Sequence, residues 1–302
     1  MGAFLLLGAP APRSVARHDL DVSFRAGNVT LSGTLSVPGG SVRPRPVAVF
    51  VSGDGPQDRD GNPGGAGLFR VLAESLIAHG IVVLRHDDRG AGLSSAPTGP
   101  PSYRSLIGDT RAAIAFVRNR AECDPRRVLL VGHSEGAGTC AVLAAEDTSI
   151  AGIALLAGAT AVNVDTLLEE QARLDPHGPA PRLLPTLARA KAGEDARAPD
   201  DLVLWMREHL EIAPREVLPR IRCSVLILQG DADHLVRSHH AAEAAALIER
   251  GGNRRVTLRT FPGLSHVFNR RAPGAPASAD VVRVDPIVAG TLARWADTTD
   301  SR

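Results

Sequence analysis

The stretch RRVLLVGHSEGAGTCAVLAAE, residues 126–146, changes pattern at its centre. Residues 126–131 are two arginines followed by valine and leucine, which is typical of a buried strand. Residues 135–146 are mostly small residues and helix formers, which predicts a helix with a narrow first turn. Ser134 lies at the joint, within a Gly-x-Ser-x-Gly pattern. A chain with 30 glycines can contain that pattern by chance, so the surrounding sequence has to decide what Ser134 does.

Apolar runs without alternation recur along the rest of the chain. Such runs indicate strands that are buried on both faces, as in a parallel sheet covered by helices. The intervals between the runs have helical periodicity, most clearly over residues 68–80 and 105–122. The runs themselves cover residues 47–52, 81–86, 127–132, 151–157, 224–229 and 255–261. This order predicts an α/β fold with a mostly parallel, doubly wound sheet.

Three intervals depart from that order. Residues 19–40 alternate between apolar and polar residues around a turn at 26–28, which predicts an N-terminal antiparallel hairpin. The interval 160–222 has helical patterns and prolines but no strand-like run, which predicts a helical insertion over one end of the sheet. The proline- and alanine-rich residues 270–280 predict a surface loop. The expected organisation is a single domain over 19–302 with its core in 19–159 and 223–302, the insertion at 160–222, and an N-terminal extension at 1–18.

The composition of the 302-residue chain favours small-molecule chemistry. Its hydrophobic content of 44% and charged content of 22% are those of a globular protein. The formal net charge of +1 gives no electrostatic reason to expect binding to nucleic acid or to an anionic membrane. Cys123, Cys140 and Cys223 are scattered and form no CxxC pair, so they predict buried free thiols rather than disulfides or a zinc site.

The N-terminal segment MGAFLLLGAPAPR, residues 1–13, contains a short apolar run. No lysine or arginine precedes this run, so it is a poor secretory signal, and it is too short to span a bilayer. We therefore expect a cytoplasmic protein without a membrane span, with an atypical or trimmed leader as the alternative.

The strand-to-helix joint gives Ser134 the setting of a nucleophile. A nucleophile turn strains the backbone and brings strand and helix close together, and Gly132 and Gly136 leave room where a Cβ would clash. The joint also lies at the positive N-terminal end of the helix, which favours negative charge developing on a substrate oxygen. We therefore interpret Ser134 as a candidate nucleophile.

A serine nucleophile requires a base, and the base requires an acid that orients it. Asp231 and Asp233 lie in the loop after the predicted strand 224–229, and His266 lies just after the last predicted strand. Loops that follow parallel strands leave the sheet at the same edge, so we expect these side chains to lie near Ser134.

The remaining histidines near these positions have other predicted roles. His133, beside the candidate nucleophile, is expected to be structural or to line the pocket. His234, His239 and His240 could form a metal site with the two aspartates, but we favour no metal and expect His239 and His240 to face solvent or a groove.

The oxyanion of an acyl-transfer reaction needs backbone N–H donors. We expect one donor from Glu135, the residue after the candidate nucleophile, and the other from the loop VSGDGPQDRDG, residues 51–61. Gly53 and Gly55 would let this backbone approach a ligand, so the Asp54 amide between them is the candidate. The alternative is a plain tight turn followed by a solvated run of charges.

The chain from about Asp19 onward resembles the α/β-hydrolase superfamily, and within it a bacterial esterase group labelled serine-aminopeptidase-like or dipeptidyl-aminopeptidase-like. The resemblance implies an α/β-hydrolase fold, with Ser134 as nucleophile, His266 as base, and Asp233 rather than Asp231 as acid. The segments that carry it are GDGPQDRDG (53–61), RHDDRGAGLSS (85–95), DPRRVLLVGHSEGA (124–137), GDADHLV (230–236) and GLSHVF (263–268).

The same resemblance assigns roles outside these three residues. It implies that Asp88, Arg89 and Gly90 form a structural loop near the site and that residues 160–222 are the cap. Ser52 stands where the group often has histidine, which is tolerable because the expected oxyanion donor is a backbone amide. Side chains of the cap are expected either to line an apolar pocket or to pack within the cap: Leu183, Leu184, Leu187, Leu202, Leu204 and Trp205.

Together these features predict a serine hydrolase that cleaves carboxylic esters of small to medium acyl groups through an acyl-enzyme, with no cofactor and no metal. Serine rather than aspartate at the turn argues against haloalkane dehalogenase or epoxide hydrolase chemistry. A thioesterase, a peptidase or an acyltransferase could use the same three residues, and a non-catalytic binding protein is a more remote alternative. The expected partner is a small-molecule ester, and the sequence predicts no particular oligomeric state.

Overall fold

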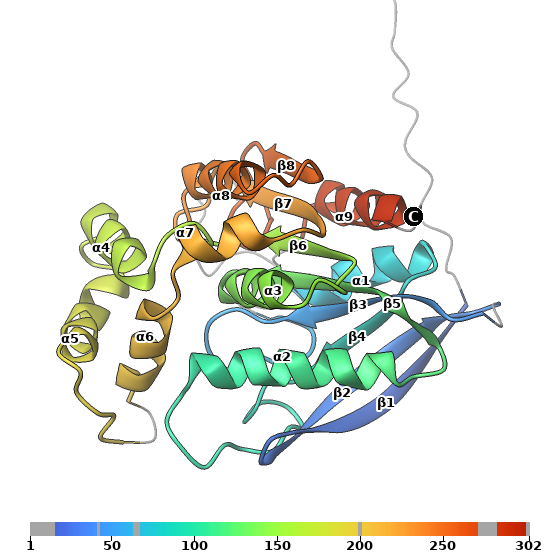
Figure 1. Ribbon diagram of the computed structural model, residues 1–302, viewed down its shortest axis with the longest axis horizontal. Helices are drawn as coiled ribbons and strands as arrows, with labels where there is room; N and C mark the ends of the chain where they lie inside the picture. Colours follow the sequence, from blue (N-terminus) through green and yellow to red (C-terminus); the bar gives the residue numbers. More distant parts are fainter. Residues whose placement is uncertain (1–15, 41–42, 63–66, 199–200, 271–282, 300–302) are drawn as a thin grey trace, which may run out of the picture.

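The computed structural model describes residues 16–40, 43–62, 67–198, 201–270 and 283–299 (Figure 1). Its strands form one eight-stranded sheet in the order β1-β2-β4-β3-β5-β6-β7-β8. β1 pairs with β2 and β2 with β4 in antiparallel fashion, whereas the other neighbouring strands are parallel. The strands are β1 (Arg17–Ala26), β2 (Val29–Pro38), β3 (Arg45–Val51), β4 (Val82–His86), β5 (Cys123–His133), β6 (Gly152–Leu156), β7 (Ser224–Gly230) and β8 (Val256–Phe261). The predicted hairpin and mostly parallel sheet are confirmed.

Helices cover both faces of this sheet, as its continuous apolar strands predict (Figure 1). Val47 and Val49 of β3 belong to the hydrophobic core under α2, α3 and α8, and the alternate residues Ala48 and Phe50 belong to the core under α1 and α9. The covering helices are α1 (Leu68–Ala78), α2 (Tyr103–Arg118), α3 (Glu135–Glu146), α8 (Ser238–Arg250) and α9 (Pro286–Thr299). The two cores hold the parallel strands in register, so that the loops after β3, β5, β7 and β8 leave at one edge.

A group of helices between β6 and β7 lies at one end of the molecule (Figure 1). It has a small hydrophobic core of its own, which includes Leu168, Leu187, Val203 and Met206. We call residues 164–217 the helical segment; it consists of α4 (Val164–Leu174), α5 (Ala180–Lys191), α6 (Val203–Leu210) and α7 (Pro214–Val217). The short 3₁₀ helix η2 (Leu218–Arg220) then leads into β7.

The three cysteines are buried and carry free thiols, as their scattered positions predict. Burial raises the pKa of the Cys123 thiol to about 12. Among the helices of the described residues, none combines the length and the apolar character that crossing a bilayer requires. The predictions for the N-terminal residues 1–15 and for a surface loop over 271–280 lie outside the described residues.

Candidate active site

The turn at Ser134 is strained, and two glycines make it possible. β5 ends at His133, α3 begins at Glu135, and Ser134 between them has φ 55° and ψ −118°. A Cβ atom on Gly132 would lie 2.3 Å from the carbonyl oxygen of Gly136, and a Cβ on Gly136 would lie 2.3 Å from that of Val51. Strand and helix can therefore approach this closely only with glycine at both positions, as the sequence pattern indicates.

Asp233 and His266 meet at the same edge of the sheet. Nδ1–H of His266 donates to Oδ2 of Asp233 at 2.8 Å. The backbone N–H groups of Leu235 and Val236 donate to the other carboxylate oxygen at 2.8 and 2.9 Å, and Nε2 of Gln229 donates to Oδ2 at 2.9 Å. Burial alone raises the pKa of Asp233, but these hydrogen bonds and the charge of His266 outweigh it and hold the pKa below its usual value.

Asp231 and His133, two other residues singled out from the sequence in this region, make different hydrogen bonds. Asp231 accepts a hydrogen bond from the backbone N–H of Gly263 at 2.6 Å and so ties the loops after β7 and β8 together. Nε2–H of His133 donates to the carbonyl oxygen of His266 at 2.9 Å. Burial, followed by the charge of His266, lowers the pKa of His133 to about 3. His133 is therefore a neutral buried support for the His266 loop.

The loop over residues 51–61 is held by buried ionic and hydrogen-bonded contacts. Oγ of Ser52 donates to Oδ1 of Asp88 at 2.6 Å, and the backbone N–H of Gln57 donates to Oδ2 of the same carboxylate at 2.9 Å. The guanidinium of Arg59 binds Asp87 through two hydrogen bonds of 3.0 and 2.7 Å. Of the charges in this segment, Arg59 is thus engaged with the loop after β4, whereas Asp54 and Asp58 are exposed.

The Asp-Arg-Gly turn after β4 is fixed in a similar way. Arg89 forms two hydrogen bonds with the buried carboxylate of Asp109 on α2, at 2.8 and 2.6 Å. Gly90 has a φ of 79°, which favours glycine. This turn thus contacts the 51–61 loop through Asp88 and α2 through Arg89.

Ser134, Glu135, Asp54 and His266 all line one cavity of about 320 Å³. Gly53 brings the 51–61 loop against the serine, since a Cβ at this glycine would lie 3.1 Å from Cβ of Ser134. The two residues whose amides are the candidate oxyanion donors therefore flank the serine in one cavity.

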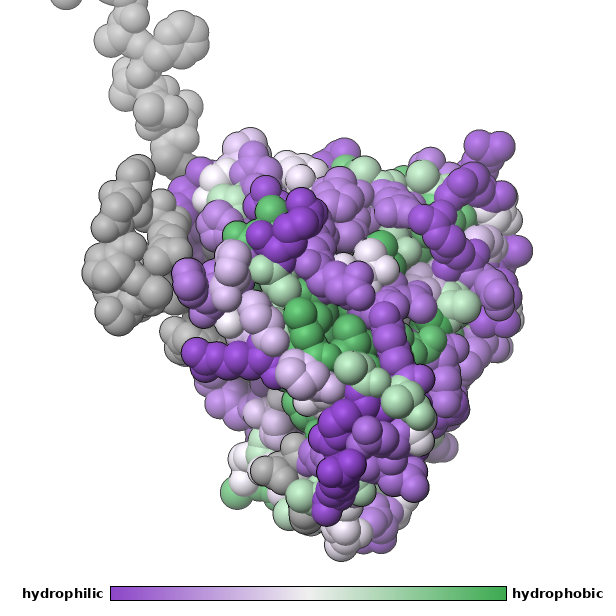
Figure 2. Space-filling model, turned by 90° about the vertical axis from the view of Figure 1, so that its left-hand side faces the viewer, coloured by the Kyte–Doolittle hydropathy of each residue, from purple (hydrophilic) through white to green (hydrophobic). Residues whose placement is uncertain are grey.

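The helical segment supplies much of the rest of the lining, including Leu167, Leu168 and Gln171 of α4. Figure 2 views the molecule from the side of this segment and shows hydrophobic side chains gathered in a hollowed strip between hydrophilic margins. Of the six cap residues proposed from the sequence, only Leu183 and Trp205 are among the lining residues. Leu184 and Leu187 pack in the core of the segment instead, and neither Leu202 nor Leu204 lines the cavity.

The side chain of Glu135 makes contacts that the sequence does not predict. Oε1 accepts hydrogen bonds from Nε1 of Trp205 and from Nε2 of His209, both at 2.6 Å and both from α6. The ring of His209 stacks on Tyr103 with centroids 3.7 Å apart. Burial and the charge of Glu135 raise the pKa of Asp54 in the same cavity. The only sequence signal was a glutamate directly after the serine, because its partners come from another part of the chain.

Of the two histidines expected to face solvent or a groove after the acid loop, His239 agrees with its prediction and His240 differs from it. His234 and His239 are exposed, but His240 is buried and its Nε2 lies 2.6 Å from Oε2 of Glu170 on α4. His240 was expected to face solvent or a groove; the packing of α4 against the start of α8 covers it. The potential metal ligands that cluster in the described residues are Glu170, His239 and His240, not the aspartates of the loop.

Known proteins resemble this chain in sequence and in structure. The family model of serine aminopeptidase, S33, matches residues 64–191. Esterase EstD of Thermotoga maritima is 28% identical over 294 residues, which are 94% of this chain and 68% of that protein. The quorum-quenching protein AidA of Acinetobacter baumannii is 32% identical over 141 residues, or 46% of this chain and 44% of that protein.

A solved structure of Est1E from Butyrivibrio proteoclasticus with bound ferulic acid superposes with a TM-score of 0.66 at 15% identity, and covers 93% of this chain and 100% of its own. The esterase Pf2001 of Pyrococcus furiosus gives a TM-score of 0.62 at 19% identity, with 87% and 88% covered. The strand order and these similarities agree that the chain has the α/β-hydrolase fold and is a hydrolase, similar to serine aminopeptidase S33 and to esterases.

Proposed function

We propose that this hydrolase is a serine esterase that cleaves carboxylic esters of small to medium acyl groups, with Ser134 as nucleophile, His266 as general base and Asp233 as the acid that orients it. The observation that carries the proposal is the 2.8 Å hydrogen bond between Asp233 and His266 at a cavity that the strained Ser134 also lines. A histidine held in one tautomer at the same cavity as a half-buried serine is the arrangement that can activate the hydroxyl.

In the proposed reaction, Oγ of Ser134 attacks the ester carbonyl carbon while Nε2 of His266 accepts the hydroxyl proton. Asp233 holds Nδ1–H and stabilises the imidazolium that forms. The backbone N–H groups of Glu135 and Asp54 donate to the oxyanion. The tetrahedral intermediate then collapses, the C–O bond to the alcohol breaks, and His266 gives its proton to the departing oxygen. Water, deprotonated by His266, cleaves the acyl-enzyme in the same way and restores Ser134.

The cavity and the relatives support an ester as the substrate. A volume of about 320 Å³ with leucine, valine and tryptophan in its lining suits a small or medium apolar group. EstD and Pf2001 are named esterases, and Est1E was solved with ferulic acid. The name of the matching family, serine aminopeptidase, makes a peptide bond the second candidate, because the same three residues serve both reactions.

The test is the hydrolysis of p-nitrophenyl esters from acetyl to dodecanoyl by the wild type, by Ser134→Ala, and by Ser149→Ala as a control at an exposed serine. We expect activity to peak at one chain length, to fall by about 10⁴-fold or more in Ser134→Ala, and to stay unchanged in the control.

A fluorophosphonate that labels Ser134 in a wild type inert to every ester would overturn the substrate class and direct the search to peptide p-nitroanilides. A wild type that neither turns over esters nor reacts with the fluorophosphonate would overturn the nucleophile as well.

A further inference from the structure

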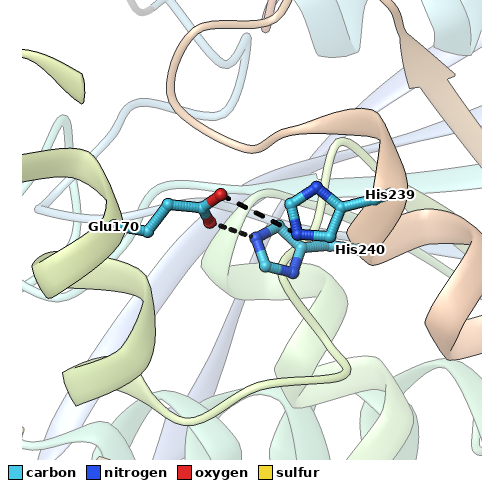
Figure 3. A group of neighbouring side chains, drawn as sticks. All are labelled: Glu170, His239 and His240. Atoms are coloured by element: carbon cyan, nitrogen blue, oxygen red, sulfur yellow. Dashed lines mark hydrogen bonds and ion pairs between the residues drawn. The ribbon is translucent and has the colours of Figure 1, made fainter. Parts of the chain in front are cut away.

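We propose that Glu170, His239 and His240 form a binding site for a divalent first-row transition-metal ion, of which Zn²⁺ suits the donors best. Figure 3 shows the three side chains converging, with Glu170 reaching from α4 and the two histidines from the first turn of α8. A ring nitrogen of each histidine and a carboxylate oxygen all lie within 4.8 Å of one another. This site is separate from Ser134 and does not depend on the proposed esterase activity.

The donor set and its spacing fit such an ion. Two imidazoles with one carboxylate are donors that Zn²⁺ accepts readily, whereas Ca²⁺ and Mg²⁺ prefer oxygen ligands alone. Ligands at about 2.0–2.1 Å from a tetrahedral ion lie about 3.3 Å from one another. Glu170 lies 2.6 Å from Nε2 of His240 and 3.8 Å from Nε2 of His239, so the two distances bracket that separation. Rotation of exposed His239 and a small shift of Glu170 would bring both distances to it.

Burial distinguishes this cluster from a chance group on the surface. The side chain of His240 is 2% exposed and that of Glu170 17%, which keeps both in place, whereas that of His239 is 59% exposed and leaves the ion a route from solvent. Nδ1 of His240 is buried and has no hydrogen-bond partner among the described residues. No second hydrogen bond therefore fixes this ring, and it can present a nitrogen lone pair to a metal.

Binding replaces one proton in the cluster. In the metal-free state Nε2–H of His240 donates to Glu170. On coordination through Nε2, the ion takes the place of that proton, and the imidazole carries its hydrogen on Nδ1. Three protein ligands leave a fourth position for water.

The ion would join the helical segment to the core beside the cavity. Next to Glu170, Nε2 of Gln171 donates to the carbonyl oxygen of Leu235 in the loop that carries Asp233, at 2.7 Å. Gln171, Leu235 and Val236 all line the cavity. A metal at this position would therefore cross-link α4 to α8 and hold one wall of the cavity against the loop.

The experiment titrates ZnCl₂ into the untagged, EDTA-treated full chain by isothermal titration calorimetry, with Co²⁺ absorption as a second readout of a site that contains nitrogen ligands. The variants are Glu170→Gln on α4 and His239→Ala on α8. His177→Ala removes an exposed histidine elsewhere in the helical segment and serves as the control. Because His239 is exposed, its variant is expected to fold, and circular dichroism checks this.

We expect one Zn²⁺ per chain at micromolar or lower concentration, weakened about 10- to 100-fold in each ligand variant and less than twofold in the control. Zn²⁺ should raise the Tm of the wild type and of His177→Ala but not that of Glu170→Gln. Three results would each overturn the proposal: no saturable binding to the wild type, wild-type affinity in Glu170→Gln and His239→Ala, or a loss of affinity in His177→Ala as large as in the ligand variants.

Discussion

Two pairs of carboxylate and histidine meet at the same cavity, which His266, Glu135 and His209 line while Asp233 lies buried behind His266, and the pairs are held in different ways. Asp233 and His266 are 2.8 Å apart, and Asp233 is fixed by two backbone N–H groups of its own loop. Glu135 and His209 are 2.6 Å apart, but the hydrogen bonds that we find to the Glu135 carboxylate come from side chains of α6. The first pair belongs entirely to loops of the sheet, and the second joins the sheet to the helical segment.

A carboxylate–histidine hydrogen bond can thus fix one pair within the sheet and, in the other pair, link the sheet to the helical segment. The position of Asp233 would survive a movement of the helical segment, because β7 and its loop determine it. The environment of Glu135 would change with such a movement, since Trp205 and His209 would leave with α6. We therefore expect the first pair to control the chemical step and the second to control how the cavity wall meets the substrate.

The largest effect is expected from Asp233→Asn. The amide keeps the size of the side chain but removes the charge that stabilises the imidazolium and selects its tautomer, so kcat should fall by about 10⁴-fold. The measurement is kcat on the best p-nitrophenyl ester, with the fold checked by circular dichroism. A loss of less than tenfold in a folded variant would contradict the assigned acid.

The matched change in the second pair, Glu135→Gln, should be far milder. An amide oxygen can still accept from Trp205 and His209, but the charge is lost, so we expect kcat/KM to fall by about tenfold, mostly through KM. Glu146→Gln, at the exposed end of the same helix, is the control and should change kcat/KM by less than twofold. A loss in kcat as large as that of Asp233→Asn would show that Glu135 takes part in the chemistry and would remove the contrast.

The smallest effect concerns His133, a third histidine of the site, whose ring nitrogen donates to a carbonyl rather than to a carboxylate. Its pKa of about 3 in the folded protein lies below the value of about 6.5 in an unfolded chain, so the unfolded state binds the proton first as the pH falls. This histidine should therefore lower the free energy of unfolding by about 1.4 kcal/mol per pH unit from pH 6 towards pH 4.

Urea unfolding of the wild type and of His133→Gln across pH 4–8 measures this contribution. Glutamine can donate to the same carbonyl but does not titrate. Below pH 6, the free energy of unfolding of the variant should therefore fall less steeply with decreasing pH, by about 1.4 kcal/mol per pH unit, which corresponds to one proton. Parallel curves for the two proteins would mean that His133 is not buried in its neutral form.

The sequence was most informative where local pattern and topology act together. The apolar run before Ser134 and the glycines on both sides of it predict the strained turn, because only a close strand-to-helix joint requires them. Asp233 and His266 could be placed at one edge since each directly follows a parallel strand. The choice between Asp231 and Asp233 came from the resemblance, and the structure bonds Asp233 to His266.

The contacts of the helical segment could not be predicted from local pattern and topology. Its helices were expected from their periodicity, but their orientation depends on packing between residues far apart in the chain. The sequence therefore left open whether Leu187 lines the pocket or packs within the cap, and it packs in the core of the segment. His240 was expected to face solvent or a groove, but it is buried against Glu170. The partners of Glu135 could not be predicted for the same reason, since Trp205 and His209 lie 70 and 74 positions away in the sequence.

The close approach at Gly132 and Gly136 also bears on how this protein could be altered. A single methyl group at either position would collide with backbone rather than with a movable side chain, so nearby substitutions cannot relieve the clash one at a time. The turn at Ser134 is in this sense inseparable from the packing of β3, β5 and α3. The wall formed by α4 and α6 has no such restriction, and laboratory evolution towards new substrates should accumulate its changes there.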